Sequence, residues 1–73
     1  FKIKGSAPLY VIEKLINQDL SHYQVNTVNG LVLTQLGQLP QRQEKLVLPE
    51  LTLEVTEVAG TRVLEVRLFP RND

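Results

Sequence analysis

The sequence predicts a small α+β domain with the element order β-α-α-β-β-β, in which two helices lie on one face of a small mixed or antiparallel sheet. Three observations predict this class. Apolar residues recur at helical spacing over residues 9–16 and again over 28–36. In the second half of the chain, apolar residues alternate with polar ones over 51–56 and 64–68. The dipeptide Ala59-Gly60 separates these two runs and predicts a hairpin turn.

Length and composition limit the functions to consider. A chain of 73 residues forms one domain and buries only about 60% of its unfolded surface. It has no cysteine, which excludes disulfides and thiolate metal sites. Eight Lys and Arg balance eight Asp and Glu, and a net charge of zero disfavours nucleic acid as a partner. No apolar run approaches the roughly 18 residues of a membrane-spanning helix, so membrane contact is expected only through a parent protein.

The first part of the chain predicts a strand and then a helix. Phe1 to Lys4 alternates apolar and charged residues, so Phe1 and Ile3 are expected to face the core. Since this run begins the chain without a Met, residues 1–73 are interpreted as a single domain excised from a larger protein. A helix over residues 8–17 follows, with Ser6 as its N-cap. Its apolar stripe consists of Leu9, Ile12, Leu15 and Ile16, and Leu20 in the polar connection beyond it is expected to turn inward.

The run from Thr27 to Pro40 fits two structures. As a helix, it begins with Thr27 as N-cap, ends at a left-handed Gly37, and has Pro40 beyond its end. As a hairpin, it would turn at Asn29-Gly30 and pair residues 25–28 with residues 31–34. The residue pattern alone does not choose between them. The apolar face of the helix would consist of Val28, Leu31, Val32 and Leu36.

The last part of the chain predicts three strands. A solvated loop over 41–45 leads to a short strand over 46–48, which Pro49-Glu50 ends. A two-residue loop at Ala59-Gly60 would place Glu54 opposite Glu65, an unfavourable like-charge pair on the outer face. Residues 70–73 are expected to be a frayed tail. In this register the apolar pairs are Val55 with Leu64, Leu53 with Val66, and Leu51 with Leu68.

No cluster of residues predicts a catalytic or metal centre. The single histidine, His22, is expected to be a solvated loop side chain, and Ser6 and Ser21 lack the sequence context of a nucleophile. Tyr10 and Val11 flank the stripe of the first helix and mark either a contact surface or a partly covered helix shoulder. Several carboxylates of the hairpin are expected to form a charged outer sheet face, with an acidic patch for a cation or a basic partner as the alternative; they are Glu50, Glu54, Glu57 and Glu65.

Gly30 is the one residue that suggests a ligand. A glycine in a helix costs up to about 1 kcal/mol against Ala at an interior site, so its presence in a first turn needs a reason. Gly30 either permits the close approach of another backbone or leaves room for a ligand at the helix start. An adenine nucleotide or FAD is the ligand class considered, which makes Gly30 the candidate cofactor-binding residue.

The central run also carries a resemblance to a known family. Residues 27–40 read Thr-x-x-Gly-Leu-Val-Leu-x-x-Leu-Gly-x-Leu-Pro, and Arg-Val-x-x-Val-Arg follows at 62–67. This pattern resembles the transporter-associated domain at the C-terminal end of CorC/HlyC-type proteins, in which the central run is a helix. Two residues depart from the pattern. Gln43 stands where a loop glycine is common, and Ala59 stands before Gly60, where an acidic residue is often found. The residues that match read as framework residues: Thr27, Gly30, Leu31, Leu36, Gly37, Pro40, Gly60 and Val66.

The resemblance implies a regulatory function without catalysis. In that family the domain follows a pair of nucleotide-binding CBS domains, often behind a membrane segment, in hemolysin-like proteins linked to magnesium and cobalt transport. The resemblance therefore implies a non-enzymatic domain at the cytoplasmic face of the membrane, which binds CBS domains of the same or a neighbouring chain or forms a homodimer. Two alternatives are a nucleotide- or flavin-binding module, because the fold is similar to part of the FAD-binding domain of certain flavoenzymes, and a purely oligomeric role.

Overall fold

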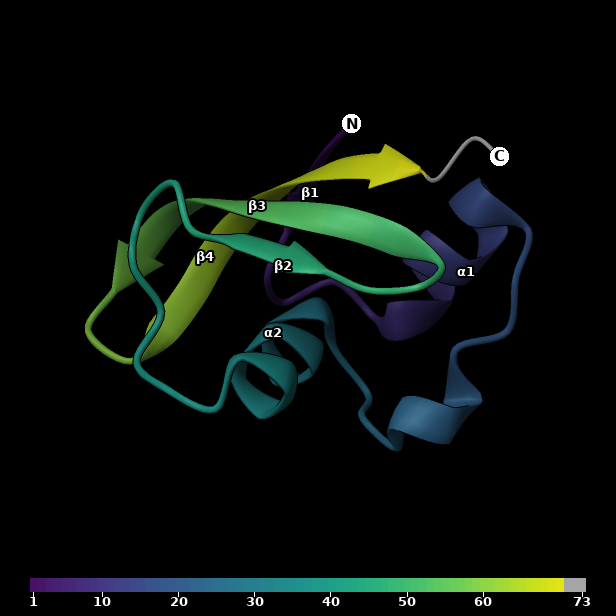
Figure 1. The fold of residues 1–73 in the computed structure, drawn as a ribbon, viewed down its shortest axis with the longest axis horizontal. Coiled ribbons are helices and arrows are strands. Elements are labelled where there is room, and N and C mark those ends of the chain that lie inside the picture. Colours follow the sequence, from purple (N-terminus) through teal and green to yellow (C-terminus); the bar gives the residue numbers. More distant parts are fainter. Residues whose placement is uncertain (71–73) are drawn as a thin grey trace.

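The computed structural model describes residues 1–70 and has the predicted element order. Its four strands are β1 (Lys2–Lys4), β2 (Lys45–Val47), β3 (Leu51–Ala59) and β4 (Arg62–Pro70), and they lie in the order β1-β4-β3-β2 with every neighbouring pair antiparallel. Two helices, α1 (Leu9–Ile16) and α2 (Val28–Leu36), lie on the same side of this sheet (Figure 1). A short 3-10 helix, η1 (Ser21–Tyr23), connects them. The predicted α+β class is confirmed.

Residues 28–36 form a helix, and the hairpin interpretation of this run is wrong. The side chain of Thr27 caps the helix by accepting a hydrogen bond from the Gly30 N–H at 3.0 Å. Gly37 ends the helix with φ +70°, a conformation that glycine adopts without steric cost. The predicted apolar face meets the core: Val28, Leu31 and Val32 are buried, and Leu36 packs against them partly buried.

The start and the stripe of α1 differ from the prediction. Ser6 is not the cap: Pro8 precedes the first helical residue, and no side chain caps the helix. The Leu9 N–H instead donates to the Asn26 carbonyl at 2.9 Å, so a distant backbone oxygen takes the place of a local cap. Leu15 is 42% exposed, because at about 100° per residue it lies roughly 60° outside the stripe that Ile12 and its neighbours bury.

The β3–β4 hairpin is shifted by two residues from the predicted register. Its turn is Gly60-Thr61, so Leu53 pairs with Leu68 rather than with Val66. Gly60 has φ +61° and Thr61 is outside the left-handed region, which is the arrangement of a type II′ turn with glycine first. The expected like-charge pair is therefore wrong, because Glu54 lies opposite Arg67. A shift by an even number of residues leaves the core-facing parity unchanged.

Two register irregularities interrupt the hairpin between Val55 and Val58. An extra residue in one strand changes which side chains point inward beyond it. On β4 the core-facing residue near the turn is therefore Val63, which is 1% exposed, while Leu64 is 46% exposed, so its prediction as a core residue is wrong. Pro70, predicted as part of a tail, is the last residue of β4, and residues 71–73 lie outside the described part of the chain.

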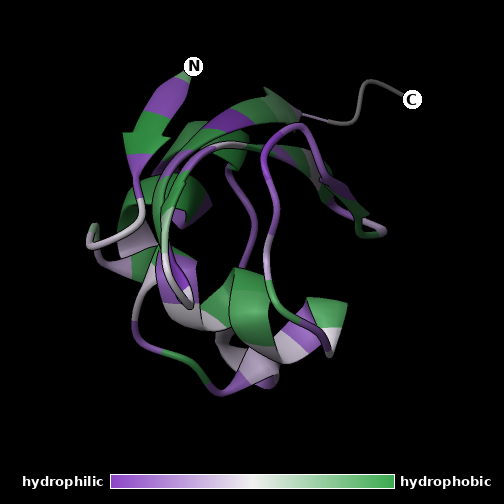
Figure 2. Cartoon of the chain, turned by 90° about the vertical axis from the view of Figure 1, so that its left-hand side faces the viewer, coloured by the Kyte–Doolittle hydropathy of each residue, from purple (hydrophilic) through white to green (hydrophobic). Residues whose placement is uncertain are grey.

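One apolar core fills the space between the sheet and the helices. Figure 2 shows the helices on one side of the strands, whose residues alternate between hydrophobic and hydrophilic. Leu20 is fully buried, which confirms that it turns inward. Within residues 1–70 no polar or charged residue is buried. The core draws on every strand and on both helices; its fully buried members are Ile12, Leu20, Val28, Leu31, Val32, Leu51, Leu53, Val55, Val63, Val66 and Leu68.

Candidate functional site

The start of α2, where the sequence suggests a ligand, is hydrogen-bonded within the chain. The N–H of Val28 donates to the Ala7 carbonyl at 3.0 Å, and the N–H of Asn29 donates to the Gly5 carbonyl at 2.8 Å. The N–H of Gly30 donates to Oγ1 of Thr27, the N-cap residue. These are the groups that a helix start offers to an anion, so a phosphate there would have to displace protein acceptors.

Gly30 lies against side chains rather than against another backbone. A Cβ built on it would lie 3.3 Å from Thr27 Oγ1 and 3.5 Å from Val25 Cβ. The close backbone approach occurs at Gly5, where a Cβ would lie 1.9 Å from the Val63 carbonyl oxygen. The Gly5 N–H also donates to the Leu64 carbonyl at 2.8 Å, so Gly5 joins the turn after β1 to the irregular part of β4.

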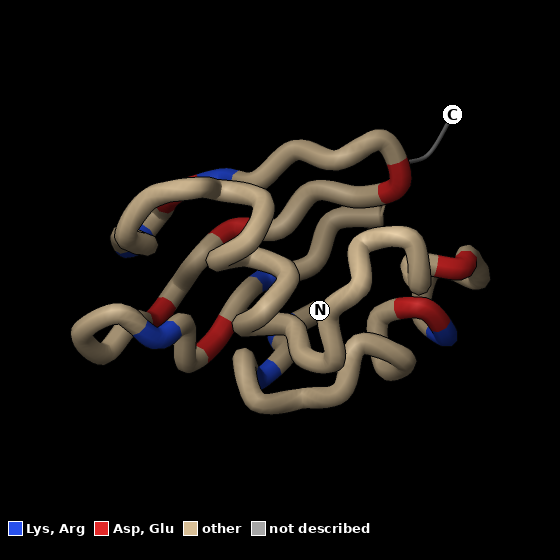
Figure 3. Tube along the Cα trace, turned by 90° about the horizontal axis from the view of Figure 1, so that it is seen from below, with Lys and Arg blue, Asp and Glu red and all other residues tan. Residues whose placement is uncertain are grey.

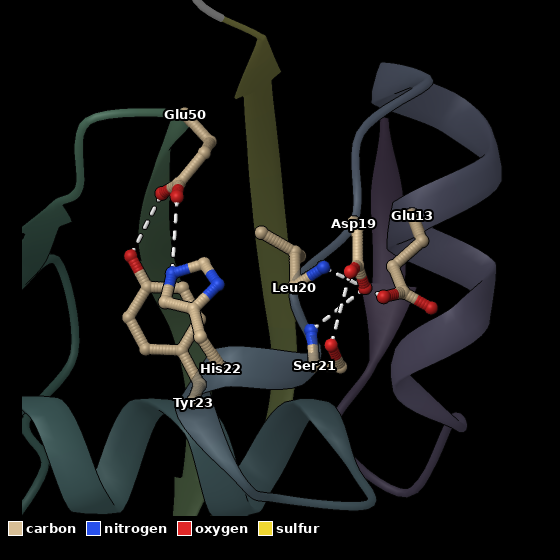
Figure 4. Close-up of polar contacts among 7 residues, drawn as sticks. All are labelled: Glu13, Asp19, Leu20, Ser21, His22, Tyr23 and Glu50. Atoms are coloured by element: carbon tan, nitrogen blue, oxygen red, sulfur yellow. Dashed lines mark hydrogen bonds and ion pairs between the residues drawn. The ribbon is translucent and has the colours of Figure 1, made fainter.

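A polar cluster that sequence reasoning missed ties η1 to the residue before β3 (Figure 4). The Glu50 carboxylate accepts a hydrogen bond from the Tyr23 hydroxyl at 2.7 Å and lies 3.2 Å from His22 Nε2. The centroids of the two rings lie 4.1 Å apart, with the ring planes tilted by 38°. We call His22, Tyr23 and Glu50 the η1 clasp. The His22 side chain is exposed, as predicted, but it has a partner, and no local signal in the sequence connects it to Glu50.

The protonation state of Tyr23 makes it a hydrogen-bond donor. Burial, together with the hydrogen bond to Glu50 and the negative charge of Glu50, raises the pKa of Tyr23 to about 12. At neutral pH the hydroxyl is therefore protonated and donates a hydrogen bond to the Glu50 carboxylate. The clasp in this state fastens the connection between α1 and α2 to the sheet.

Two more carboxylates hold the same connection from the α1 side (Figure 4). Glu13 Oε2 accepts a hydrogen bond from the Leu20 N–H at 2.7 Å, which keeps Leu20 turned inward. Asp19 accepts from the N–H of Ser21 at 2.9 Å and from its hydroxyl at 3.0 Å. The hydrogen bond from the Ser21 backbone, and then that from its side chain, lower the pKa of Asp19 from its ordinary value.

The described residues contain neither an assembled metal centre nor a membrane span. Within residues 1–70, no group of three or more His, Cys, Asp or Glu side chains is arranged to hold a metal ion. In the same part of the chain, no helix is long and apolar enough to cross a membrane. An open depression of about 450 Å³ lies beside the end of α1, and its lining residues are Tyr10, Glu13, Lys14, Asn17, Gln18 and Asp19.

The framework residues hold the fold at its turns and in its core. Thr27 and Gly37 cap α2, and Gly60 makes the hairpin turn. Leu31, Pro40 and Val66 are buried. A capped helix against a four-stranded antiparallel sheet agrees with the resemblance to a transporter-associated domain. The family model of that domain, CorC_HlyC, matches residues 1–72, and the chain belongs to this family.

Two curated relatives extend the comparison to whole proteins. The UPF0053 inner membrane protein YfjD of Escherichia coli (strain K12) is 28% identical over 68 residues, which are 93% of this chain and 16% of that protein. The UPF0053 protein sll0260 of Synechocystis sp. is 34% identical over 58 residues, which are 80% of this chain and 12% of that protein. The chain thus spans less than a fifth of the length of each of these relatives.

Solved structures share the fold over nearly the whole chain. A region from Neisseria meningitidis MC58, whose name links it to a Mg2+ and Co2+ transporter (CorC), superposes with a TM-score of 0.85 at 24% identity, covering 96% of this chain and 86% of that one. A transporter-associated domain of a CBS domain protein from Porphyromonas gingivalis gives 0.80 at 21% identity, covering 97% and 87%. This chain also covers most of each of these solved chains.

Proposed function

We propose that this chain is a non-catalytic regulatory domain of a larger membrane-associated protein and that it modulates the transport of a divalent cation such as Mg2+ or Co2+ from the cytoplasmic face. The match of the transporter-associated family over residues 1–72 carries the proposal. The name of the N. meningitidis neighbour, which refers to a Mg2+ and Co2+ transporter, supports the choice of cation. The small share of the relatives' length that the chain spans supports its being one part of a longer protein.

Docking on CBS domains of the same or a neighbouring chain is the proposed mode of action. The P. gingivalis neighbour comes from a CBS domain protein, which supports this partner. A domain that binds one conformation of its partner more tightly than another shifts the equilibrium between them by the difference in binding free energy. The capped helix, the η1 clasp and the Gly5 contact give the domain the fixed shape that such discrimination needs.

The test is deletion of residues 1–73 from the full gene product, with Mg2+ and Co2+ efflux measured in cells. We expect efflux, or its dependence on the intracellular cation level, to change. Gly5→Ala should reproduce the deletion, because the added methyl group collides with the Val63 carbonyl, whereas Thr34→Ala on the exposed side of α2 should not. Unchanged efflux and unchanged regulation after deletion would contradict the proposal.

Nucleotide or flavin binding at Gly30 and homodimer formation are separate hypotheses with their own tests. Titration with FAD, AMP and ATP at millimolar concentration, followed by the amide signal of Gly30, tests the first. A bound phosphate must compete with Thr27 Oγ1 for the Gly30 N–H, so binding there should shift this amide signal. An unchanged signal at millimolar ligand would contradict the hypothesis. Light scattering at high protein concentration tests the second, and a monomer there would exclude a dimer of the isolated domain.

A further inference from the structure

The face of the sheet that turns away from the helices carries a row of charges across all four strands. Strand pairing places Lys2 opposite Arg67, Arg67 opposite Glu54, and Glu54 opposite Lys45. Ile3 and Leu46, the buried neighbours of the two lysines, point into the core, so the lysines point outward. We call these four residues the charged row; it contains three cations and one carboxylate.

The cations of the charged row have no ion-pair partner among residues 1–70. The ion pairs within 4.0 Å in this part of the chain join His22 to Glu50 and Arg42 to Glu57, and neither involves the row. Lys2, Lys45 and Arg67 are all exposed. Figure 3 shows basic and acidic positions spread along the strands of the sheet. The row therefore presents three cations and one carboxylate, a net positive charge, to whatever lies against this face.

Apolar side chains form the next row beside these charges. Val47 lies opposite Thr52, and Thr52 lies opposite Phe69. Val47 is 64% exposed and Phe69 is 40% exposed. Of these side chains, an exposed aromatic ring and an arginine are the types that protein interfaces favour at their centre.

We propose that this face is the docking surface of the domain and that it binds an acidic protein segment in the remainder of the parent polypeptide. Carboxylates of that segment pair with Lys2, Arg67 and Lys45, and an apolar side chain packs on Phe69 and Val47. The inference rests on the proposed function, because it requires a parent protein. In the two curated relatives more than four-fifths of the polypeptide lies outside the matched domain, so a partner segment in the same protein has ample length to come from.

The position of Glu54 favours a protein over an anionic membrane as the partner. Recognition of anionic lipid uses clusters of about 4–8 Lys and Arg, and a carboxylate within the cluster is repelled by the lipid headgroups. Glu54 lies between Arg67 and Lys45 in the row, and Glu65 lies opposite Lys4 in the adjoining row. A folded protein can place a cation or a donor against each of these carboxylates, which gives the surface specificity as well as attraction.

The experiment places a photoreactive benzoylphenylalanine at Val47 or at Phe69 in the full gene product that contains residues 1–73. Tyr10, which is 57% exposed on α1, is the matched control position. Cross-linked peptides are identified by mass spectrometry. We expect adducts from positions 47 and 69 with a peptide that contains Asp or Glu, and none from position 10.

Charge reversal then tests the role of the row. Arg67→Glu should lower the adduct yield at least about tenfold, because like charges facing each other oppose docking. Lys14→Glu, on α1, should leave the yield unchanged, and Lys substitution of the cross-linked carboxylate should restore the yield in Arg67→Glu. Thermal unfolding of each variant domain confirms its fold, and Lys2→Glu and Lys45→Glu provide the same test if Arg67→Glu does not fold.

Four outcomes would overturn the inference: no adduct, an equal adduct from position 10, an adduct with lipid, or a yield insensitive to all three charge reversals. Cation efflux is measured on the same variants. Docking that is lost without any change in efflux would count against the proposed function and leave the docking surface standing. Altered efflux on deletion of the domain, without cross-links from this face, would support the proposed function and count against the docking surface.

Discussion

The side-chain oxygen of Asn29 accepts a hydrogen bond from the backbone N–H of Val63 at 2.7 Å. Asn29 is in the first turn of α2, and Val63 is in β4 next to the irregular part of the hairpin. A β-bulge leaves backbone groups of the strand without a partner in the sheet. The asparagine side chain supplies the missing acceptor and fixes the start of the helix against the strand.

Replacement of Asn29 by Ala should therefore destabilise the domain. It leaves the partly buried Val63 N–H without an acceptor, at an expected cost of about 1–3 kcal/mol in the free energy of unfolding, measured by denaturant titration. Asn26→Ala is the control, because that side chain is exposed, and its effect should stay within about 0.5 kcal/mol. Equal losses for the two variants would show that the side-chain bond contributes nothing.

Gly5→Ala should be the most destabilising alanine substitution of a glycine. The new Cβ would lie 1.9 Å from the Val63 carbonyl oxygen, so the backbone must move and the bonds of the turn are lost, at about 3 kcal/mol or more. Gly37→Ala meets no atom within 4 Å but has φ +70°, and should cost about 1–2 kcal/mol.

Gly30→Ala tests whether close packing at the start of α2 requires a glycine. Ala gains up to about 1 kcal/mol of helix propensity, and the 3.3 Å contact with Thr27 Oγ1 offsets part of that gain. We expect thermal unfolding within a few degrees of wild type. A loss as large as that of Gly5→Ala would mean that the helix start is packed more closely than these contacts indicate.

Gln43→Gly should stabilise the domain. Gln43 has φ +67°, a conformation that costs a side chain about 1–2 kcal/mol. Glycine removes that strain and adds some freedom to the unfolded chain, so a net gain of about 0.5 kcal/mol is expected. Gln41→Gly in the same loop lacks the positive φ and should lose stability instead. A loss in both variants would show that the Gln43 backbone is not strained.

The Tyr23 phenol should ionise near pH 12, which ultraviolet titration of a Tyr10→Phe variant would measure without interference from a second tyrosine. A folded-state pKa above the unfolded value of 10.0 stabilises the native state below pH 10, and this stabilisation is lost as the pH rises from 10 to about 12. The free energy of unfolding should fall across that interval in wild type and fall less in Tyr23→Phe. Parallel curves would exclude the clasp as the cause.

Once the family resemblance had favoured a helix over a hairpin for this run, the extent and orientation of α2 were predictable because its signals are local. Its cap, its C-terminal glycine and its apolar face lie within residues 27–37, and each is a property of neighbouring residues. The hairpin was predictable only in part. Ala59-Gly60 and Gly60-Thr61 both put core residues opposite core residues, so hydrophobic alternation could not choose the register, and the turn geometry of Gly60 did.

The η1 clasp and the Gly5 contact could not be predicted from local pattern. Tyr23 and Glu50 are 27 residues apart in the sequence, and neither stands in a motif that indicates the other. Gly5 resembles any glycine between a strand and a helix until the Val63 carbonyl is placed against it. In the same way, the three cations of the charged row come from three different strands, and only the strand order makes them neighbours.

The sequence by itself determined which side chains of β3 enter the core, where α2 begins and ends, and the family, since each depends on residues close together along the chain. Only the tertiary structure decided the hairpin register and the exposure of Leu15 and Leu64. It also decided that the Asn26 carbonyl, and not the Ser6 side chain, accepts a hydrogen bond at the start of α1, and that charges group on the outer face. The reason is that these depend on contacts between distant segments, whose geometry is fixed when the helices pack on the sheet and not before.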